Sequence, residues 1–329
     1  MKFSLLFAFL LTFFATHLNA RVDNHTLYLS VDTSSKHLHI KAQLGSQVIN
    51  YSLDERVSET HKNFDATLTK LNSWTLDKAY LNKTLSHYET ALYRPIAALL
   101  NKAKRVHFVL DEGSFDFALD LVLHKGQPLF LQYPVSFSYV PVNANKQYRF
   151  NEFGRALVVR DETTDPESAS LMMSKWLEDT QHHEMEDITK AGLKKRNRFD
   201  VALLSLHGIA GEGDAFMELN DEQVFASDLQ QLKGKLLYLD SCQMGSSYSF
   251  AAEFSNSKTE FIVAPLFDNE AGGSSTATIK SFFTQVNSGK TPADAMHITR
   301  KTLFKDYEKA DNFTTAIWKA CPFRMIQIR

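Results

Sequence analysis

Cysteine is scarce in this sequence: Cys242 and Cys321 are the only two among 329 residues. Two thiols allow one disulfide, which would be the simplest use for both in an oxidising compartment. A reactive thiol at one position is the alternative. The residues around Cys242 favour that alternative, so we expect the two cysteines not to be bonded to each other.

Charge of one sign is not in excess either, since 36 Lys and Arg residues stand against 38 Asp and Glu residues, for a net charge of −2. This balance gives no reason to expect nucleic acid or an anionic membrane as a partner. Internal repeats, proline-rich linkers and low-complexity blocks are also missing from the sequence, so no domain boundary is indicated. We therefore expect residues 21–329 to form a single domain.

An apolar run at residues 3–15 follows Lys2 and precedes a polar stretch that ends at Ala20. This is the layout of a secretory signal peptide over residues 1–20. The run is shorter than the roughly 20 apolar residues that span a bilayer, although an uncleaved membrane anchor stays open as the alternative. No cysteine lies near the expected cut, which excludes a lipoprotein anchor. We expect an exported protein, periplasmic or secreted, with no stable membrane insertion after cleavage.

The rest of the chain alternates between strand-like and helical patterns. Strands are predicted at 25–31, 37–44, 46–53, 105–111, 128–141 and 155–161, and helices across 58–104, 166–180 and 184–197. Pro95 marks a break within the first helical region. These patterns predict an α/β fold with a mostly parallel central sheet flanked by helices, preceded by a small N-terminal β-hairpin and helical segment.

The clearest signal lies in "FDVALLSLHG" at 199–208 and "KLLYLDSCQMG" at 235–245. Each is a continuous apolar run that stops at a polar, glycine-containing turn, as strands buried on both faces of a parallel sheet do. The stretch between His207 and Cys242 exceeds the dozen or so residues that a parallel crossover needs. Both residues are therefore expected at the carboxyl ends of neighbouring strands, where open α/β sheets place their active sites.

Cysteine and histidine together form the minimum set for thiol catalysis. A thiol attacks as its thiolate, and a positioned imidazole can take the proton and return it to the leaving amine. The small residues 245–247 would let the chain turn into a helix whose N-terminal amides favour the thiolate. Gly208 would bring a backbone N–H close to a substrate carbonyl. Alone, His207 is more often a core histidine and Cys242 an inert small hydrophobe.

Other polar clusters give weaker signals. His182 and Glu186 in "HHEMED" have helical i, i+4 spacing that could bind a metal, but the expected helix is charged and solvent-facing. "GIAGEGD" is rich in glycine, yet it lacks the lysine and hydroxyl residue of a phosphate loop. We therefore expect no metal and no cofactor.

The two boxes, "LSLHG" and "LLYLDSCQMG", resemble those of the caspase-like cysteine peptidases, the clan of caspases, gingipains and separases, and within it the CHAT type. The resemblance continues upstream through "LYRPIAALLNKAKRVHFVLD" and downstream through "EFIVAPLFDNEAGGSSTATIK", and covers about residues 92–304. Three departures stand out. "GSFDFALDL" replaces a leucine-to-proline-phenylalanine pattern, Phe267 replaces a common tryptophan, and Cys242-Gln243-Met244-Gly245 stands where Cys-Glu-x-Gly is frequent.

This resemblance implies Cys242 as nucleophile, His207 as general base, and the backbone of Gly208 and Cys242 as oxyanion hole. Relatives with acidic primary pockets cleave after arginine or lysine. The nearby acids are Asp240, Asp214, Asp268 and Glu270. Asp240 lies on the same side of its strand as Cys242. Asp268 lies in a loop that can curl over the cleft, so Asp268 is the favoured acid for the substrate pocket. Each acid could also be an ordinary solvated residue or a helix cap.

Two functions of different classes follow. The first is an exported cysteine endopeptidase that cleaves a protein or peptide substrate, with preference for a basic residue. The second is a catalytically idle caspase-like domain that binds or scaffolds, with unknown partner proteins. An activated Cys242 is expected to react with iodoacetamide well below neutral pH, which an idle thiol would not do.

Overall fold

The computed structural model describes residues 24–144, 154–196, 199–210, 214–232, 234–310 and 312–329. Its strands are β1 Thr26–Asp32, β2 His37–Leu44, β3 Gln47–Arg56, β4 Arg105–Leu110, β5 Leu123–His124, β6 Gln127–Pro128, β7 Val135–Ser138, β8 Arg155–Arg160, β9 Asp179–Glu184, β10 Val201–Ser205, β11 Gly208–Ile209, β12 Phe216–Leu219, β13 Glu222–Phe225, β14 Leu236–Asp240, β15 Phe261–Pro265 and β16 Phe323–Gln327. Its helices are α2 Val57–Asn72, α3 Lys78–Tyr80, α4 Ser86–Tyr88, α5 Ala97–Leu100, α6 Leu129–Gln132, α7 Lys190–Lys194, α8 Ala226–Leu229, α9 Tyr248–Glu253, α10 Gly273–Asn287, α11 Pro292–Ala310 and α12 Phe313–Ala320. The expected signal peptide lies outside the described residues.

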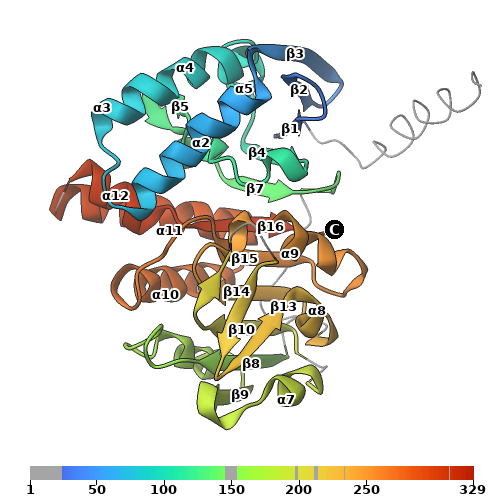
Figure 1. Cartoon of the computed structure of the whole chain (residues 1–329), viewed down its shortest axis with the longest axis vertical. Coiled ribbons are helices and arrows are strands. Elements are labelled where there is room, and N and C mark those ends of the chain that lie inside the picture. Colours follow the sequence, from blue (N-terminus) through green and yellow to red (C-terminus); the bar gives the residue numbers. More distant parts are fainter. Residues whose placement is uncertain (1–23, 145–153, 197–198, 211–213, 233, 311) are drawn as a thin grey trace, which may run out of the picture.

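One 11-stranded sheet runs through the molecule in the order β3-β2-β1-β4-β7-β16-β15-β14-β10-β8-β9 (Figure 1). Strands β1, β4, β7 and β16 are parallel to one another, and so are β15, β14, β10, β8 and β9. The antiparallel pair β15–β16 joins these two blocks. The carboxyl ends of β8, β10, β14 and β15 therefore meet at one edge, and those of β4 and β7 lie at the opposite edge.

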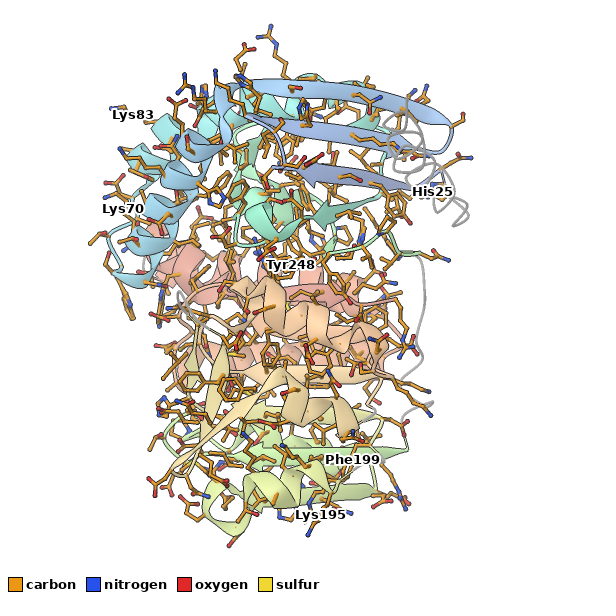
Figure 2. All side chains as sticks on the ribbon, turned by 45° about the vertical axis from the view of Figure 1, so that its right-hand side comes forward. His25, Lys70, Lys83, Lys195, Phe199 and Tyr248 are labelled. Atoms are coloured by element: carbon orange, nitrogen blue, oxygen red, sulfur yellow. The ribbon has the colours of Figure 1, made fainter. Side chains whose placement is uncertain are left out.

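The second block is covered on both faces, as its continuous apolar strands require. Along β10, Val201 and Leu203 pack in a cluster with α10 and α11, whereas Ala202 and Leu204 belong to the cluster that contains α8 and α9. This alternation follows from the two-residue period of a strand. Side chains fill the layers on each side of the sheet, and Lys83 and Lys195 lie exposed near opposite ends of the molecule (Figure 2).

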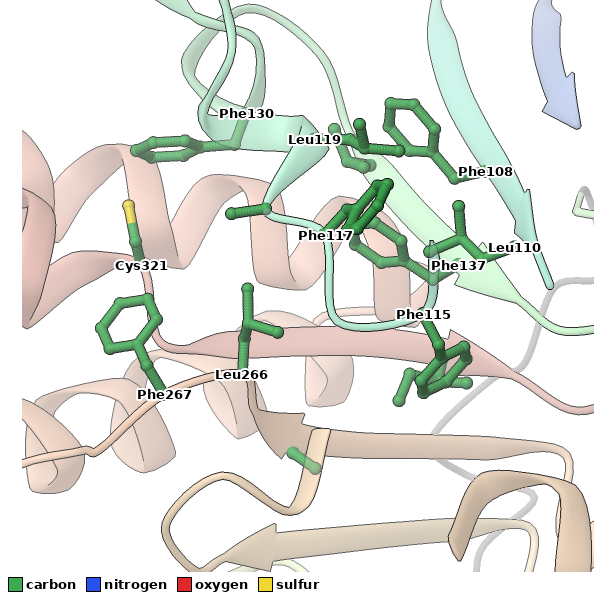
Figure 3. Close-up of a cluster of buried hydrophobic side chains, with 14 of the residues drawn as sticks. Phe108, Leu110, Phe115, Phe117, Leu119, Phe130, Phe137, Leu266, Phe267 and Cys321 are labelled. Carbon is green, nitrogen blue, oxygen red and sulfur yellow. The ribbon is translucent and has the colours of Figure 1, made fainter. Parts of the chain in front are cut away.

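A cluster of aromatic side chains lies where the two blocks meet (Figure 3). Phe108 of β4 and Phe137 of β7 stack with ring centroids 5.5 Å apart. Phe117 lies beside them, and Leu266 and Phe267, just after β15, extend the same core toward Cys321. The N-terminal and C-terminal parts of the chain thus share one buried core.

Several sequence predictions are confirmed. The fold is α/β with a large, mostly parallel sheet flanked by helices, β10 and β14 are adjacent and parallel, and the helical region breaks at Pro95. The expected N-terminal β-hairpin is present, because β1 and β2 pair antiparallel, and it extends the main sheet through the parallel pairing of β1 with β4. No helix in the described residues is long and apolar enough to cross a membrane.

Two predicted helices and one predicted strand are wrong in part. Residues 179–184 form the edge strand β9, which is paired with β8, and only Lys190–Lys194 of the second expected helix is α-helical. Within 166–180 the helical part is the short 3-10 stretch Ala169–Lys175. Within 128–141, the strand begins only at Val135, after the helical turn α6. Polar side chains at an exposed edge strand hide its two-residue period, which explains the error at β9.

Candidate active site

His207 and Cys242 each lie two residues beyond the last registered pair of β10 and β14. That pair is Ser205 opposite Asp240. The strands are parallel, so both polar residues leave the sheet at the same edge, as the sequence predicts. The two loops touch directly, because a Cβ built on Gly208 would lie 2.5 Å from the Cys242 carbonyl oxygen and 2.9 Å from its nitrogen. Only glycine permits this approach, which sets the histidine segment against the Cys242 backbone.

The imidazole of His207 is held on the side of β8. Its side chain is 55% exposed, and Nε2 lies 3.0 Å from Thr163 Oγ1 and 3.7 Å from Asp161 Oδ2. Asp161 is buried at the end of β8, and its Oδ1 accepts hydrogen bonds from the Thr163 amide and hydroxyl, both at 2.8 Å. Because the Thr163 hydroxyl donates to Asp161, it accepts from Nε2–H. Nδ1 of His207 is then the nitrogen with a free lone pair.

The Cys242 thiol is half-buried, and Sγ donates to the main-chain oxygen of Asn269 at 3.8 Å. Burial raises the pKa of Cys242, and the carboxylates of Asp268 and Asp240 raise it further, against the lowering effect of the Asn269 contact. The expected helix N-terminus does not support the thiolate. Helix α9 begins only at Tyr248 and has six residues.

The buried carboxylate of Asp240 is held in hydrogen bonds within the fold. It is 2% exposed, and it accepts hydrogen bonds from Ser205 Oγ at 2.8 Å, from Asn269 Nδ2 at 2.8 Å and from the hydroxyl of Ser275. Burial raises the pKa of Asp240 to about 6. Its carboxylate ties β10, β14, the loop after β15 and helix α10 together beneath the two site residues.

Asp268 lies in the loop beside the thiol, directly before Asn269, whose main-chain oxygen accepts from Cys242 Sγ. Its Oδ1 accepts a hydrogen bond from Gln243 Nε2 at 2.8 Å, and its main-chain N–H donates to Asn72 Oδ1 at 2.9 Å. Gln243, directly after Cys242, has φ +59°, a left-handed conformation that costs a non-glycine residue about 1–2 kcal/mol. The loop is therefore held from two directions, by the turn after Cys242 and by the end of α2.

The other two acidic candidates have different surroundings. Glu270 accepts a hydrogen bond from the Ser274 amide at 2.8 Å, at the start of α10, and forms an ion pair with Lys319 at 3.4 Å. Asp214 is exposed and lines a pocket of about 360 Å³ with Phe225, Phe250, Glu253 and neighbouring residues. Neither His207 nor Cys242 lines that pocket. The four acids therefore do not form one cluster.

The remaining sequence candidates are placed as follows. His182 lies in strand β9 and Glu186 in a 3-10 turn, so the helical spacing assumed for a metal pair does not exist. Within the described residues, no three or more His, Cys, Asp or Glu side chains are grouped as a metal site would need. Cys242 and Cys321 are both free thiols, and Cys321 is 2% exposed.

Sequence reasoning missed four residues of the site: Asp161, Thr163, Asn269 and Asn72. The sequence did give a signal for Asp161, because this residue ends the apolar run "RALVVRD", just as His207 and Cys242 follow apolar runs. Asn72 gave none, since it lies 196 positions from its partner in the sequence.

No family model matches the sequence, and no curated protein matches it. Among solved structures, the chain is similar to separase in the Saccharomyces cerevisiae separase–securin complex, with a TM-score of 0.58 and 8% identity. That match covers 94% of this chain and 31% of the separase chain, so this chain spans about a third of its length. A second similar structure is the complex of the Porphyromonas gingivalis RgpB pro- and mature domains, at TM-score 0.44 and 9% identity, covering 81% of this chain and 76% of that one. The similarity to separase shows a shared α/β fold with a large, mostly parallel central sheet flanked by helices.

Proposed function

We propose that the chain is an exported cysteine endopeptidase of the CHAT type that uses His207 and Cys242 and cleaves after a basic residue. The observation that carries this proposal is the meeting of the two strand ends, where Gly208 lies against the Cys242 backbone. A histidine and a cysteine at that edge of a caspase-like sheet are the groups that thiol-dependent acyl transfer needs.

The proposed chemistry starts from a neutral thiol, because burial raises the pKa of Cys242. Nδ1 of His207 accepts the thiol proton as sulfur bonds to the substrate carbonyl carbon, and the main-chain N–H groups of Gly208 and Cys242 receive the developing oxyanion. The imidazolium then protonates the leaving amine. Water, activated by the same nitrogen, cleaves the thioester and restores the thiol. Asp161 and Thr163 act as positioning residues that fix the ring through Nε2.

Asp268 is the proposed acid for the basic substrate side chain. Asp240 already accepts three side-chain hydrogen bonds. Glu270 accepts a hydrogen bond from the first turn of α10 and pairs with Lys319. Asp268 lies in the loop beside the thiol and is hydrogen-bonded to Gln243. A desolvated guanidinium or ammonium group needs a carboxylate partner, preferably a bidentate one for arginine.

The idle-domain alternative has one observation in its favour: the thiol has a raised pKa and donates to the Asn269 carbonyl. A peptide-library cleavage assay separates the two functions. Cys242→Ala and His207→Ala should each abolish cleavage, and Cys321→Ala serves as the matched cysteine control. Equal cleavage by wild type and Cys242→Ala would defeat the endopeptidase proposal.

Specificity is tested with Asp268→Asn beside Asp214→Asn, whose acid lies in the separate pocket. Losing a charge-assisted contact worth roughly 1.5–3 kcal/mol should lower turnover of a basic peptide about ten- to a hundred-fold in Asp268→Asn. The same loss in Asp214→Asn instead would move the assignment to that pocket. Equal cleavage after Leu and Arg by the wild type would exclude an acidic pocket.

A further inference from the structure

Trp74 is an unusual residue at the end of α2. Its side chain is 55% exposed, and its backbone has φ +60°. The helix ends here with the amides of Thr75 and Leu76 donating to the Lys70 carbonyl, at 2.9 and 3.1 Å. Glycine is the usual residue at such a left-handed helix end, because it avoids the steric cost. The helix end explains the backbone conformation, but it does not explain an exposed tryptophan there.

The Trp74 ring lies against Trp318 of α12, with ring centroids 3.7 Å apart and an interplanar angle of 35°. Trp318 is 5% exposed, and its Nε1 is buried without a hydrogen-bond partner in the part of the chain that the structure describes. Helix α12 and the end of α2 lie side by side on one flank of the molecule (Figure 1). We call these two rings the tryptophan pair.

The tryptophan pair borders the loop over the thiol from two sides. Asn72, two residues before Trp74, accepts a hydrogen bond from the Asp268 amide, and Lys319, directly after Trp318, pairs with Glu270. Between these two contacts lies Asn269, whose carbonyl oxygen faces the Cys242 thiol. The exposed ring is thus next to the loop that carries the proposed recognition acid.

We propose that the tryptophan pair is a substrate subsite that binds an aromatic or aliphatic side chain of a peptide within a few residues of the scissile bond. This inference rests on the proposed function. Aromatic rings prefer offset or edge contacts with a second ring, and the exposed Trp74 ring offers such a contact two residues from Asn72, which binds the Asp268 amide. A protein partner or a second copy would need roughly 800 Å² of contact on each side. The other large exposed hydrophobic residues among those described, Val48, Val140 and Ile209, lie on other elements. The tryptophan pair therefore suits a single side chain of a peptide better than a protein interface.

The test uses peptides with arginine before the scissile bond and either Phe or Gly at each neighbouring position in turn. The quantity measured is the ratio of kcat/KM for Phe over Gly at each position. Trp74→Gly suits the left-handed backbone and removes the ring, Trp74→Phe keeps a ring, and Val48→Ala is the matched control for an exposed hydrophobic residue. The same peptides, fluorescently labelled, are titrated into the Cys242→Ala variant with and without Trp74→Gly.

The wild type should prefer Phe at one position, and Trp74→Gly should lower that ratio roughly two- to twelve-fold, the size of one lost aromatic contact. Trp74→Phe and Val48→Ala should retain most of the preference. No preference at any position, or a preference that survives in Trp74→Gly, would overturn the subsite. If the wild type cleaves nothing, a Trp74-dependent preference in binding to Cys242→Ala would support the subsite while the endopeptidase proposal fails. Absence of such binding would overturn the subsite as well.

Discussion

We expect the Cys242 thiol to be protonated in the substrate-free protein at neutral pH. Burial raises its pKa above the ordinary value of 9.0, and the carboxylates of Asp268 and Asp240 add to the effect. Because the thiolate is the reactive form, alkylation by iodoacetamide should be slow at pH 7 and should accelerate only as the pH rises past 9. This prediction differs from the sequence-based expectation of labelling well below neutral pH, which assumed support from a helix N-terminus.

The measurement is the labelling rate of the folded protein between pH 5 and 10.5, followed by intact mass. Cys321 is an internal control, because burial raises its pKa to about 12 and it should stay unlabelled until the protein unfolds. A rate that already levels off below pH 7 would instead indicate a resting thiolate–imidazolium pair and contradict this prediction.

Asp240 should make stability depend on pH. Burial raises its pKa in the folded protein to about 6, from an ordinary 3.8. Between these values the folded state binds the proton more tightly, so the contribution to stability is complete below about pH 4 and is lost as the pH rises through 6. From pH 4.5 to pH 7.5, wild type should lose roughly 2 kcal/mol of unfolding free energy relative to Asp240→Asn. Urea unfolding of both proteins at the two pH values measures this, and equal pH dependence of the two would refute it.

The meeting of His207 and Cys242 at one sheet edge could be predicted from residues alone, because each follows a continuous apolar run and such runs end where parallel sheets place their sites. The positioning residues could not. Asp161 contacts His207 only because β8 is the neighbour of β10, and strand order is not encoded in local pattern. The raised pKa of Cys242 likewise depends on burial beneath a loop whose course the sequence does not reveal.

At the scale of elements, the site depends on the contact between the loops after β10 and β14. An alanine Cβ at position 208 would lie 2.5 Å from the Cys242 carbonyl oxygen, closer than real Cβ atoms approach. Gly208→Ala should therefore push the two strand ends apart, cost about 1–3 kcal/mol of stability, and lower cleavage about a hundred-fold through misplacement of the reacting groups.

Gly154→Ala is the matched control, because its Cβ would meet only the Asp200 carboxylate, at 3.4 Å. Thermal unfolding and peptide cleavage are measured on both variants. If Gly208→Ala behaved like Gly154→Ala in both assays, the close contact of the two loops would not matter for the site.

Elements with strong hydrophobic patterns were predictable, and those shaped by their neighbours were not. Strands β10 and β14 are apolar up to their last residues, Ser205 and Asp240, because both faces of the sheet are covered, so their sequences are informative. Strand β9, "DTQHHE", is polar and pairs only with β8 at the edge of the sheet, so nothing in its own residues distinguishes it from a charged helix. Helix α9 begins late because residues 244–246 after Cys242 form a 3-10 turn and Ser247 caps the helix start.

At the scale of the whole molecule, a buried ion pair links α11 to the segment that follows β4. Arg300 of α11 contacts Asp120 at 2.7 Å, with side-chain exposures of 4% and 1%. Within the first block of the sheet, Arg324 of β16 donates to the main-chain oxygens of Phe115 and Phe117, which also follow β4. These contacts, the shared aromatic core and the single sheet support the proposal that residues 21–329 form one domain.

Arg300→Met should destabilise the whole chain, because it leaves the Asp120 carboxylate buried without its partner, at a cost of about 3–5 kcal/mol. Arg155→Met, which breaks an ion pair exposed at 52% and 47%, should cost no more than about 1 kcal/mol. Adding Asp120→Leu to Arg300→Met should recover part of the loss, since an apolar pair leaves no orphaned charge.

Far-UV circular dichroism and tryptophan fluorescence report jointly, because Trp74 and Trp318 lie at the α2–α12 contact and Trp176 packs near Phe283 of α10. Both signals should shift together in one transition, since the core is continuous across β15 and β16. A transition that splits in Arg300→Met, with only one signal shifted, would show that the two blocks unfold independently and would overturn the single-domain proposal.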